Sequence, residues 1–228
     1  MKICGMEKSS LVDYDGKIAV VVFTPECNFA CPFCQNSSLL KNENLTLIEE
    51  KEIFDYLFKR RNLIDAVVIS GGEPTLQPDL IEFIKKVKNL DYLVKLDTNG
   101  SNFEVLKNLV ENKLIDYIAM DIKNSINSYN KTVSAKADID EIKKSVSYLL
   151  TDKLDYEFRT TLVKELHSKN DIIDMSKWLI GAKRLFLQKF KDSENCLLKG
   201  LNAVDILTAR EYQKILKTTV QNVYLRGY

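Results

Sequence analysis

The chain has 228 residues, of which 45% are hydrophobic, so it is long enough to bury the core of a globular domain. Its 33 Lys and Arg residues nearly equal its 32 Asp and Glu residues, and this balance favours neither a nucleic-acid partner nor a membrane surface. Residues 1–17 carry charges throughout and lack the apolar core of a signal peptide, and no apolar run reaches the ~20 residues that span a bilayer. We therefore expect a cytoplasmic protein.

Strand-like and helix-like segments alternate along the chain. Apolar runs predict strands at residues 20–23, 64–70, 93–97, 115–121, 156–163, 184–190 and 223–225. Capping motifs and helical periodicity predict helices at residues 46–60, 78–89, 101–111, 138–150 and 171–180, and from residue 208 onward. The polar segment 124–136 is predicted to be irregular.

Six strand–helix units in succession predict an α/β fold with a parallel sheet and helices outside it. A complete eight-unit barrel typically needs ~250 residues, so six units favour a partial (β/α)6 TIM-like barrel. We expect a single domain over residues 1–228. Its parts are an N-terminal extension or hairpin (1–16) with a turn at Asp15-Gly16, the barrel core (17–190), and a C-terminal helix and strand (191–228).

Three of the five cysteines form the motif Cys27-x3-Cys31-x2-Cys34, directly after the first predicted barrel strand. Three thiolates this close together can hold three irons of a [4Fe–4S] cluster, whereas clusters that only transfer electrons usually take four cysteines. The fourth iron would be open, and an open metal position is where chemistry takes place. The motif therefore predicts an active site.

Zinc and a disulfide are the alternatives for these cysteines. Three clustered cysteines leave one unpaired, which argues against a disulfide framework. Zinc normally takes four ligands, and the nearest further candidates, Cys4, Cys196 and His167, are distant in the sequence.

Polar motifs end three of the predicted strands. They are Gly71-Gly72-Glu73-Pro74, Asp97-Thr98-Asn99-Gly100 and Asp121-Ile122-Lys123. Adjacent glycines let a backbone approach a ligand closely. Because active sites of such barrels lie at the carboxyl ends of the strands, we expect these motifs to meet at the mouth of the barrel.

The cysteine motif, with Phe33 at the aromatic position of Cys-x3-Cys-x-aromatic-Cys, resembles the signature of the radical S-adenosylmethionine (SAM) superfamily. The resemblance implies a [4Fe–4S] cluster held by the three cysteines, with SAM on its open iron and no catalytic side chain beyond the two cofactors. It also implies that Phe33 lies near the adenine, and that Gly71, Gly72 and Glu73 lie at the amino group of SAM.

The Asp97-Thr98 and Asp121-x-Lys123 segments resemble those of activating enzymes of glycyl radical enzymes. The resemblance places Asp97, Thr98 and Asp121 near the amino acid moiety of SAM and Lys123 near its carboxylate. It also implies that this polar group helps to hold a monovalent cation.

The resemblance is closest to activating proteins of anaerobic (class III) ribonucleoside-triphosphate reductase, through residues 10–17, 27–36 and 159–161. It implies reductive cleavage of SAM to a 5′-deoxyadenosyl radical and formation of a glycyl radical on that reductase, with flavodoxin or ferredoxin as electron donor. Three positions depart from the family pattern: Asp15 replaces a usual Pro, Glu26 a usual Gly, and Gln35 a usual His. The charge of Glu26 would lower the cluster potential.

Two other functions stay open. One is radical SAM chemistry on a small molecule, as in 7-carboxy-7-deazaguanine synthase, and the other is a non-catalytic iron–sulfur or zinc-binding protein. Five further residues receive no role from the sequence, although Gln188 and Arg159 fall on predicted barrel strands. They are Cys4, Cys196, His167, Gln188 and Arg159.

Overall fold

The computed structural model describes residues 1–40 and 45–228. Its strands are β1 (Gly5–Ser10), β2 (Ala19–Thr24), β3 (Ala66–Gly71), β4 (Leu93–Thr98), β5 (Tyr117–Asp121), β6 (Asp155–Leu162), β7 (Arg184–Lys189) and β8 (Asn222–Arg226). Its α-helices are α1 (Glu50–Lys59), α2 (Leu80–Lys88), α3 (Phe103–Glu111), α4 (Tyr129–Val133), α5 (Ile139–Leu149), α6 (Lys169–Trp178) and α7 (Ile206–Leu216). Short 3-10 helices are η1 (Ser37–Leu39), η2 (Pro74–Leu76) and η3 (Ile126–Ser128).

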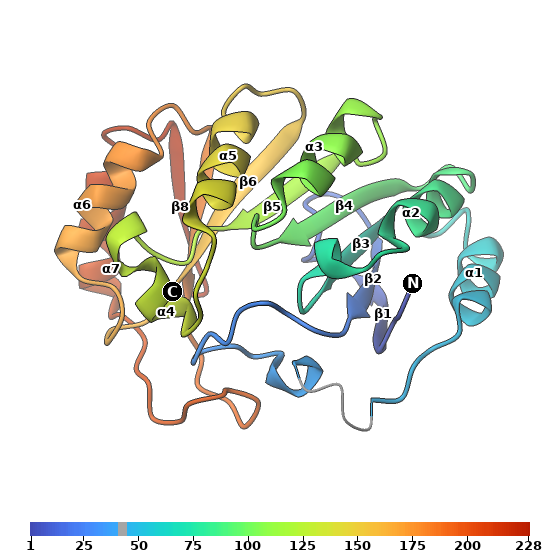
Figure 1. Ribbon diagram of the computed structural model, residues 1–228, viewed down its shortest axis with the longest axis horizontal. Coiled ribbons are helices and arrows are strands. Elements are labelled where there is room, and N and C mark those ends of the chain that lie inside the picture. Colours follow the sequence, from blue (N-terminus) through green and yellow to red (C-terminus); the bar gives the residue numbers. More distant parts are fainter. Residues whose placement is uncertain (41–44) are drawn as a thin grey trace.

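The described strands form one sheet whose order follows the chain from β1 to β8. Each pair from β2–β3 to β7–β8 is parallel, and β1 is antiparallel to β2. Figure 1 shows the helices in an arc outside the curved sheet, with the segments after β2 and β7 on its inner side. Among the described strands β8 does not pair with β1, so the predicted partial barrel is confirmed as an open one.

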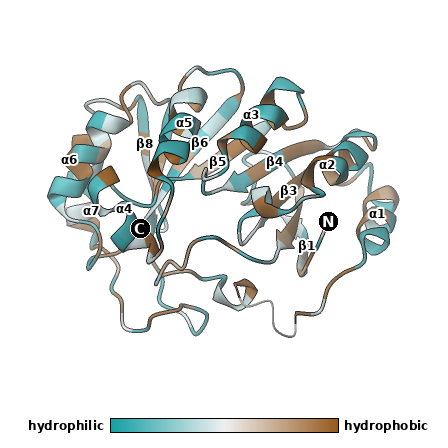
Figure 2. Cartoon of the chain, in the orientation of Figure 1, coloured by the Kyte–Doolittle hydropathy of each residue, from teal (hydrophilic) through white to brown (hydrophobic). Residues whose placement is uncertain are grey.

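β2 is apolar from Ala19 to Phe23, and both of its faces are covered. Val20 and Val22 belong to the main core, whereas Ala19 and Val21 pack inside the barrel with small residues of β3 and with Tyr14. Figure 2 shows the same hydrophobic colouring along β3. A strand buried on both faces has no alternation of apolar and polar residues, which is why the continuous run predicted it correctly.

The N-terminal segment forms a hairpin, but with β2 as its second strand. β1 pairs with β2 from Gly5 opposite Phe23, so the hairpin extends beyond the first 16 residues. The predicted turn is confirmed: Gly16 has a φ of 72°, and the Lys17 N–H donates to the Tyr14 carbonyl at 3.0 Å. The loop brings Tyr14 to Tyr117, with ring centroids 5.4 Å apart, and therefore lies against the start of β5.

Several predicted helix starts are wrong by a few residues. The capping box from Thr46 to Glu49 is absent: α1 begins at Glu50, and Glu49 is an N-cap without a side-chain hydrogen bond. Asn102 rather than Ser101 caps α3, whereas Asp138 caps α5 as predicted. Capping residues are common in loops, so several candidates compete at each helix start.

The starts of α2, α6 and α7 also differ from the predicted starts by two residues. α2 begins at Leu80 rather than Pro78, α6 is capped by Ser168, and α7 is capped by Asp205. The segment predicted as irregular contains η3 and α4. Among the described helices, none is long and apolar enough to cross a membrane.

Candidate active site

A cavity of about 390 Å³ lies where the inner face of the barrel meets the loop after β2. Its walls include ten of the eleven predicted site residues: Cys27, Cys31, Phe33, Cys34, Gly71, Gly72, Asp97, Thr98, Asp121 and Lys123. Gln35, Arg159 and Gln188 also line it. The predicted meeting of the strand ends is therefore confirmed, and Glu73 is the exception.

The three cysteines lie on the loop between β2 and η1. A tight turn, in which the Cys34 N–H donates to the Cys31 carbonyl at 3.0 Å, brings the second and third thiols to the same wall. Burial raises the pKa of Cys27 to about 12 and that of Cys31 to about 11. The free thiols are therefore protonated near neutral pH, and binding of a metal must displace their protons.

The arrangement of the thiols fits a cubane better than a single ion. In the described part of the chain, no three His, Cys, Asp or Glu side chains converge as one metal ion would require. A cubane does not require this convergence, because each cysteine sulfur binds a different iron. Cys27, Cys31 and Cys34 would hold the cluster, and thiolate sulfur is its normal ligand.

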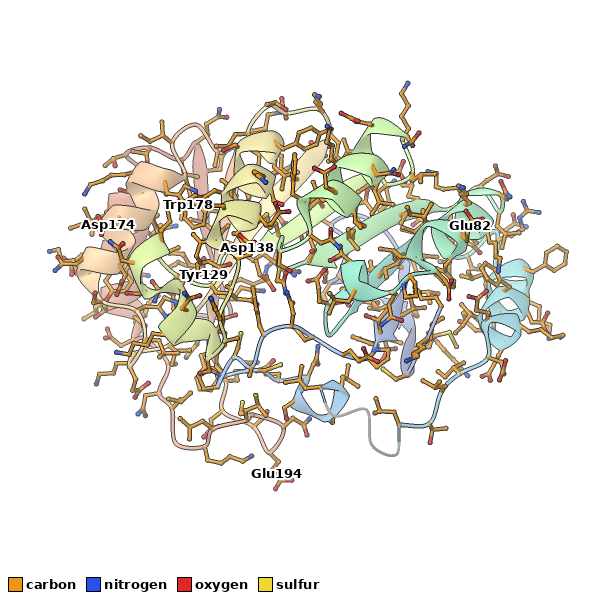
Figure 3. All side chains as sticks on the ribbon, in the orientation of Figure 1. Glu82, Tyr129, Asp138, Asp174, Trp178 and Glu194 are labelled. Carbon is orange, nitrogen blue, oxygen red and sulfur yellow. The ribbon has the colours of Figure 1, made fainter. Side chains whose placement is uncertain are left out.

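α4 packs against the cysteine loop and forms a hydrogen bond with it. The Ala30 N–H donates to the Val133 carbonyl at 3.0 Å, and the Phe29 ring packs edge-on against Tyr129 at 6.2 Å. Tyr129, labelled with Trp178 in Figure 3, also packs edge-on against Trp178, with ring centroids 6.3 Å apart. The Tyr129 hydroxyl accepts from the Lys123 N–H and donates to the Asp121 carbonyl, both at 3.4 Å. Tyr129 thus joins the cysteine loop to the end of β5.

Gly71 and Gly72 are required where the ends of β2 and β3 approach each other. A Cβ on Gly72 would overlap the Glu26 carbonyl, and a Cβ on Gly71 would overlap the Thr24 backbone. Gly71 also has a φ of 118°, which L side chains rarely adopt. The glycines therefore let the backbone beside Cys27 form a wall of the cavity.

Glu73 does not line the cavity. Its side chain is 0% exposed, and its Oε1 accepts from the hydroxyls of Thr75 at 2.6 Å and Thr98 at 2.7 Å. Its Oε2 accepts from the Asn99 N–H at 2.6 Å. Burial raises the pKa of Glu73. These contacts tie the β3–α2 loop to the end of β4, while contact of Glu73 with SAM stays a prediction.

Charged side chains of β4, β5 and β6 form a chain of alternating sign along one wall. Lys95 Nζ is 3.6 Å from Asp97 Oδ1, and Arg159 links Asp97 Oδ2 at 3.2 Å to Asp121 Oδ1 at 2.9 Å. Lys123 Nζ completes the chain, 2.9 Å from Asp121 Oδ2. Among the charged side chains that line the cavity, the cations Lys123, Arg159 and Lys189 balance the anions Asp13, Asp97 and Asp121. The Lys123 ammonium group at the end of the chain suits a ligand that carries a carboxylate.

Asp121 is held in its ionised form. Burial alone would raise its pKa, but Arg159 and Lys123 outweigh burial and lower it to about 2. The Arg159 guanidinium lies between Asp97 and Asp121, the two acids that the resemblance places around a monovalent cation. This cation stays a prediction, and Arg159 already supplies a positive charge between the two carboxylates.

Three residues left without a role in the sequence lie outside the cavity wall. His167 is 2% exposed, with Nδ1 3.1 Å from the Val163 N and Nε2 2.9 Å from the Lys123 carbonyl. The Cys4 thiol lies 3.2 Å from the Phe23 carbonyl, and Cys196 is buried in the loop after β7. His167 therefore supports the backbone of a site residue without facing the site.

Sequence reasoning missed Asn99 and Tyr129. Asn99 lies inside a motif that the sequence singled out, but the order of residues does not show that its side chain turns toward Cys27. Tyr129 lies in the segment predicted as irregular, and its helical spacing from Thr132 and Val133, which are buried with it, is a weak signal in a polar stretch.

The chain belongs to the radical SAM superfamily, whose family model matches residues 21–176. It is an enzyme of the radical SAM type, and the cofactors of this family are a [4Fe–4S] cluster and SAM. A Methanocaldococcus jannaschii protein described as a glycyl-radical enzyme activating enzyme is 36% identical, over 98% of this chain and 95% of the relative.

Two further similar proteins match this chain over a smaller part of their own length. A Pyrococcus horikoshii protein described as a GTP 3′,8-cyclase is 27% identical over 63% of this chain and 45% of the relative. The crystal structure of Streptococcus suis SuiB bound to SAM has a TM-score of 0.68 and 16% identity, and the match covers 91% of this chain and 52% of SuiB. At this identity the SuiB match shows the fold alone.

Proposed function

We propose that this protein uses a [4Fe–4S] cluster and SAM to generate a glycyl radical on a partner enzyme. The observation that carries the proposal is that one cavity brings together Cys27, Cys31 and Cys34 with the alternating charges of β4–β6. The relative that matches nearly the whole chain is described as an activating enzyme, whereas the cyclase match covers less than half of that enzyme.

The cofactors supply the radical chemistry, by one-electron reduction of SAM to methionine and a 5′-deoxyadenosyl radical. The residues of this chain bind and orient them. Cys27, Cys31 and Cys34 would bind three irons, and the Lys123 ammonium group at the end of the ion chain would attract the carboxylate of SAM. The carboxylate of Asp121 fixes the Lys123 and Arg159 side chains and would lie near the amino acid moiety of SAM.

The proposed partner is the anaerobic (class III) ribonucleotide reductase. Flavodoxin or ferredoxin would donate the electron to the cluster of this protein, in an anaerobic cytoplasm. The motifs at residues 10–17 and 159–161 support this partner over other glycyl radical enzymes. The open side of the sheet suits a loop of a protein as substrate, because β8 and β1 do not close the barrel within the described residues.

An anaerobic assay tests the function. The protein is reconstituted with iron and sulfide and mixed with dithionite and SAM, and 5′-deoxyadenosine is measured. We expect product from the wild type and none from Cys31→Ala, because the variant lacks one iron ligand. A full cubane spectrum in Cys31→Ala would contradict the ligand assignment.

The partner is tested by electron paramagnetic resonance after adding candidate enzymes. A glycyl radical signal on the anaerobic ribonucleotide reductase, absent with pyruvate formate-lyase, is the expected result. SAM cleavage with no protein radical on any candidate would favour the small-molecule alternative. An iron-loaded protein that never cleaves SAM, with any partner, would favour the non-catalytic alternative.

The ion chain is tested with Asp121→Asn, which keeps the shape of the side chain but removes its charge. We expect at least tenfold slower SAM cleavage with unchanged iron content, because Lys123 and Arg159 lose the anion that positions them. Loss of the cluster in this variant would instead give Asp121 a structural role. Glu82→Gln, which alters only an exposed ion pair with Lys85, is the control.

A further inference from the structure

Asn99 is a buried polar residue at the end of β4 to which the proposed function gives no role. Its Nδ2 atom lies 3.9 Å from the Cys27 sulfur and 2.9 Å from Asn28 Oδ1. The Cys27 sulfur also accepts from the Phe29 N–H at 3.4 Å. Two N–H donors, one from the backbone and one from a side chain, therefore face the first of the three cysteines.

The orientation of the Asn99 amide follows from its neighbours. The Ser101 N–H lies 2.9 Å from Asn99 Oδ1, and a backbone N–H can only donate. The oxygen of the amide must therefore face Ser101, so its NH2 group faces Asn28 and Cys27. Asn28 is fixed in turn, because its own Nδ2 donates to the Ser101 hydroxyl at 2.8 Å.

Glu73 holds Asn99 in this position. Its Oε2 accepts the Asn99 N–H at 2.6 Å, and its Oε1 accepts the Thr98 hydroxyl at 2.7 Å. Asn99 is only 5% exposed, so water competes little for its amide. The buried carboxylate thus fixes the end of β4 and aims the Asn99 side chain at the cysteine loop.

We propose that Asn99 donates an N–H···S hydrogen bond to the Cys27 sulfur of the loaded cluster and thereby raises its reduction potential. This rests on the ligand role of Cys27 in the proposed function. Hydrogen bonds to the sulfurs are one of the features that set the potential of an iron–sulfur cluster. A donor stabilises negative charge on sulfur, and the reduced cluster carries one more electron.

The experiment is a redox titration of the anaerobically reconstituted protein, followed by electron paramagnetic resonance of the reduced cluster. Asn99→Leu keeps the size of the side chain and removes the donor. We expect its reduction equilibrium to become at least tenfold less favourable, about 59 mV for a one-electron couple. Asn112→Leu, an exposed position at the C-terminus of α3, should leave the potential unchanged.

A loaded Asn99→Leu variant with the wild-type potential overturns the inference. If Asn99→Leu does not retain iron, Asn99→Ser replaces it, because serine keeps the acceptor for the Ser101 N–H but is too short to reach Cys27. The same negative shift in Asn99→Ser supports the inference, and an unchanged potential overturns it. A wild-type protein that binds no [4Fe–4S] cluster would instead remove the proposed function, and the inference with it.

Discussion

Glu26, next to the first cysteine, holds a backbone conformation that favours glycine. Its φ is 67°, and it is fixed by hydrogen bonds from its N–H to the Leu39 carbonyl and from the Glu73 N–H to its own carbonyl. The resemblance described under Sequence analysis implies glycine at this position. The left-handed conformation explains that preference, and Glu26 adopts it at the expense of backbone strain.

Replacing Glu26 should reveal this strain. Glu26→Gly and Glu26→Ala both lose the contacts of the side chain, including the ion pair with Lys2. The left-handed conformation costs a non-glycine residue about 1–2 kcal/mol, and glycine loses about 0.5–1 kcal/mol more backbone entropy on folding. We expect Glu26→Gly to exceed Glu26→Ala in free energy of unfolding by about 0.5–1 kcal/mol in urea titrations. If Glu26→Ala were as stable as Glu26→Gly or more stable, the inferred backbone strain at Glu26 would be wrong.

The sequence predicts which residues reach the site better than it predicts what each one contacts. The cysteines and glycines were predictable because their spacing and their lack of a side chain are local properties. Glu73 was not, because its burial depends on the path of Thr98 and Asn99, which follow a different strand. The ion pair of Arg159 with Asp121 was likewise not predictable, because it forms only when β6 pairs with β5.

At the scale of the elements, Gly71 permits the close contact between the ends of β2 and β3. Gly71→Ala and Gly181→Ala both place a Cβ at positive φ, 118° and 87°, but only Gly71 meets backbone atoms there. We expect Gly181→Ala to lose about 1–2 kcal/mol of stability, and Gly71→Ala about 1–3 kcal/mol more. Thermal unfolding measures the difference, and equal losses would mean that the strand ends separate easily.

His167 joins the loop after β6 to the loop after β5, and this contact predicts a pH dependence. Burial lowers the pKa of His167 below its ordinary value. The unfolded chain therefore binds the proton first as the pH falls below about 6.5, and the folded state loses stability from there downward. The chain has a single histidine, so no other imidazole contributes.

Urea unfolding of the apoprotein between pH 7.5 and 5.5 measures this effect. We expect the free energy of unfolding of the wild type, relative to His167→Gln, to fall toward low pH by up to about 1.4 kcal/mol per pH unit. A constant difference between the two proteins would show that the folded state binds the proton as readily as the unfolded chain.

Strands were predicted more accurately than helix starts, for a physical reason. A strand buried on both faces needs a continuous apolar run, which is visible locally, as in β2 and β3. A helix start depends on which of several polar residues the preceding loop brings into the capping position. The N-cap of α6 is Ser168, which forms a reciprocal capping box with Asp171.

For the whole molecule, the alternation of strands and helices was enough to predict an open parallel barrel. It could not predict that the segments after β2 and β7 meet on its inner side (Figure 1). The Leu198 N–H donates to the Pro32 carbonyl at 2.9 Å, and Gln35 donates to the Lys191 carbonyl at 3.0 Å. Gln35, where the resemblance implies histidine, thus helps to join the two segments.

This connection predicts that loss of the cluster loosens two distant segments together. A cluster held by Cys27, Cys31 and Cys34 stabilises its loop only in the loaded protein. The segment 191–198 should lose protection together with the cysteine loop, because the hydrogen bonds of Leu198 and Lys191 join it to Pro32 and Gln35 on that loop. Hydrogen exchange before and after anaerobic chelation should therefore rise in residues 27–40 and 191–198, while α3 stays unchanged. A rise confined to residues 27–40 would show that the two segments are energetically independent, and that the loop after β7 folds against the barrel without help from the cluster.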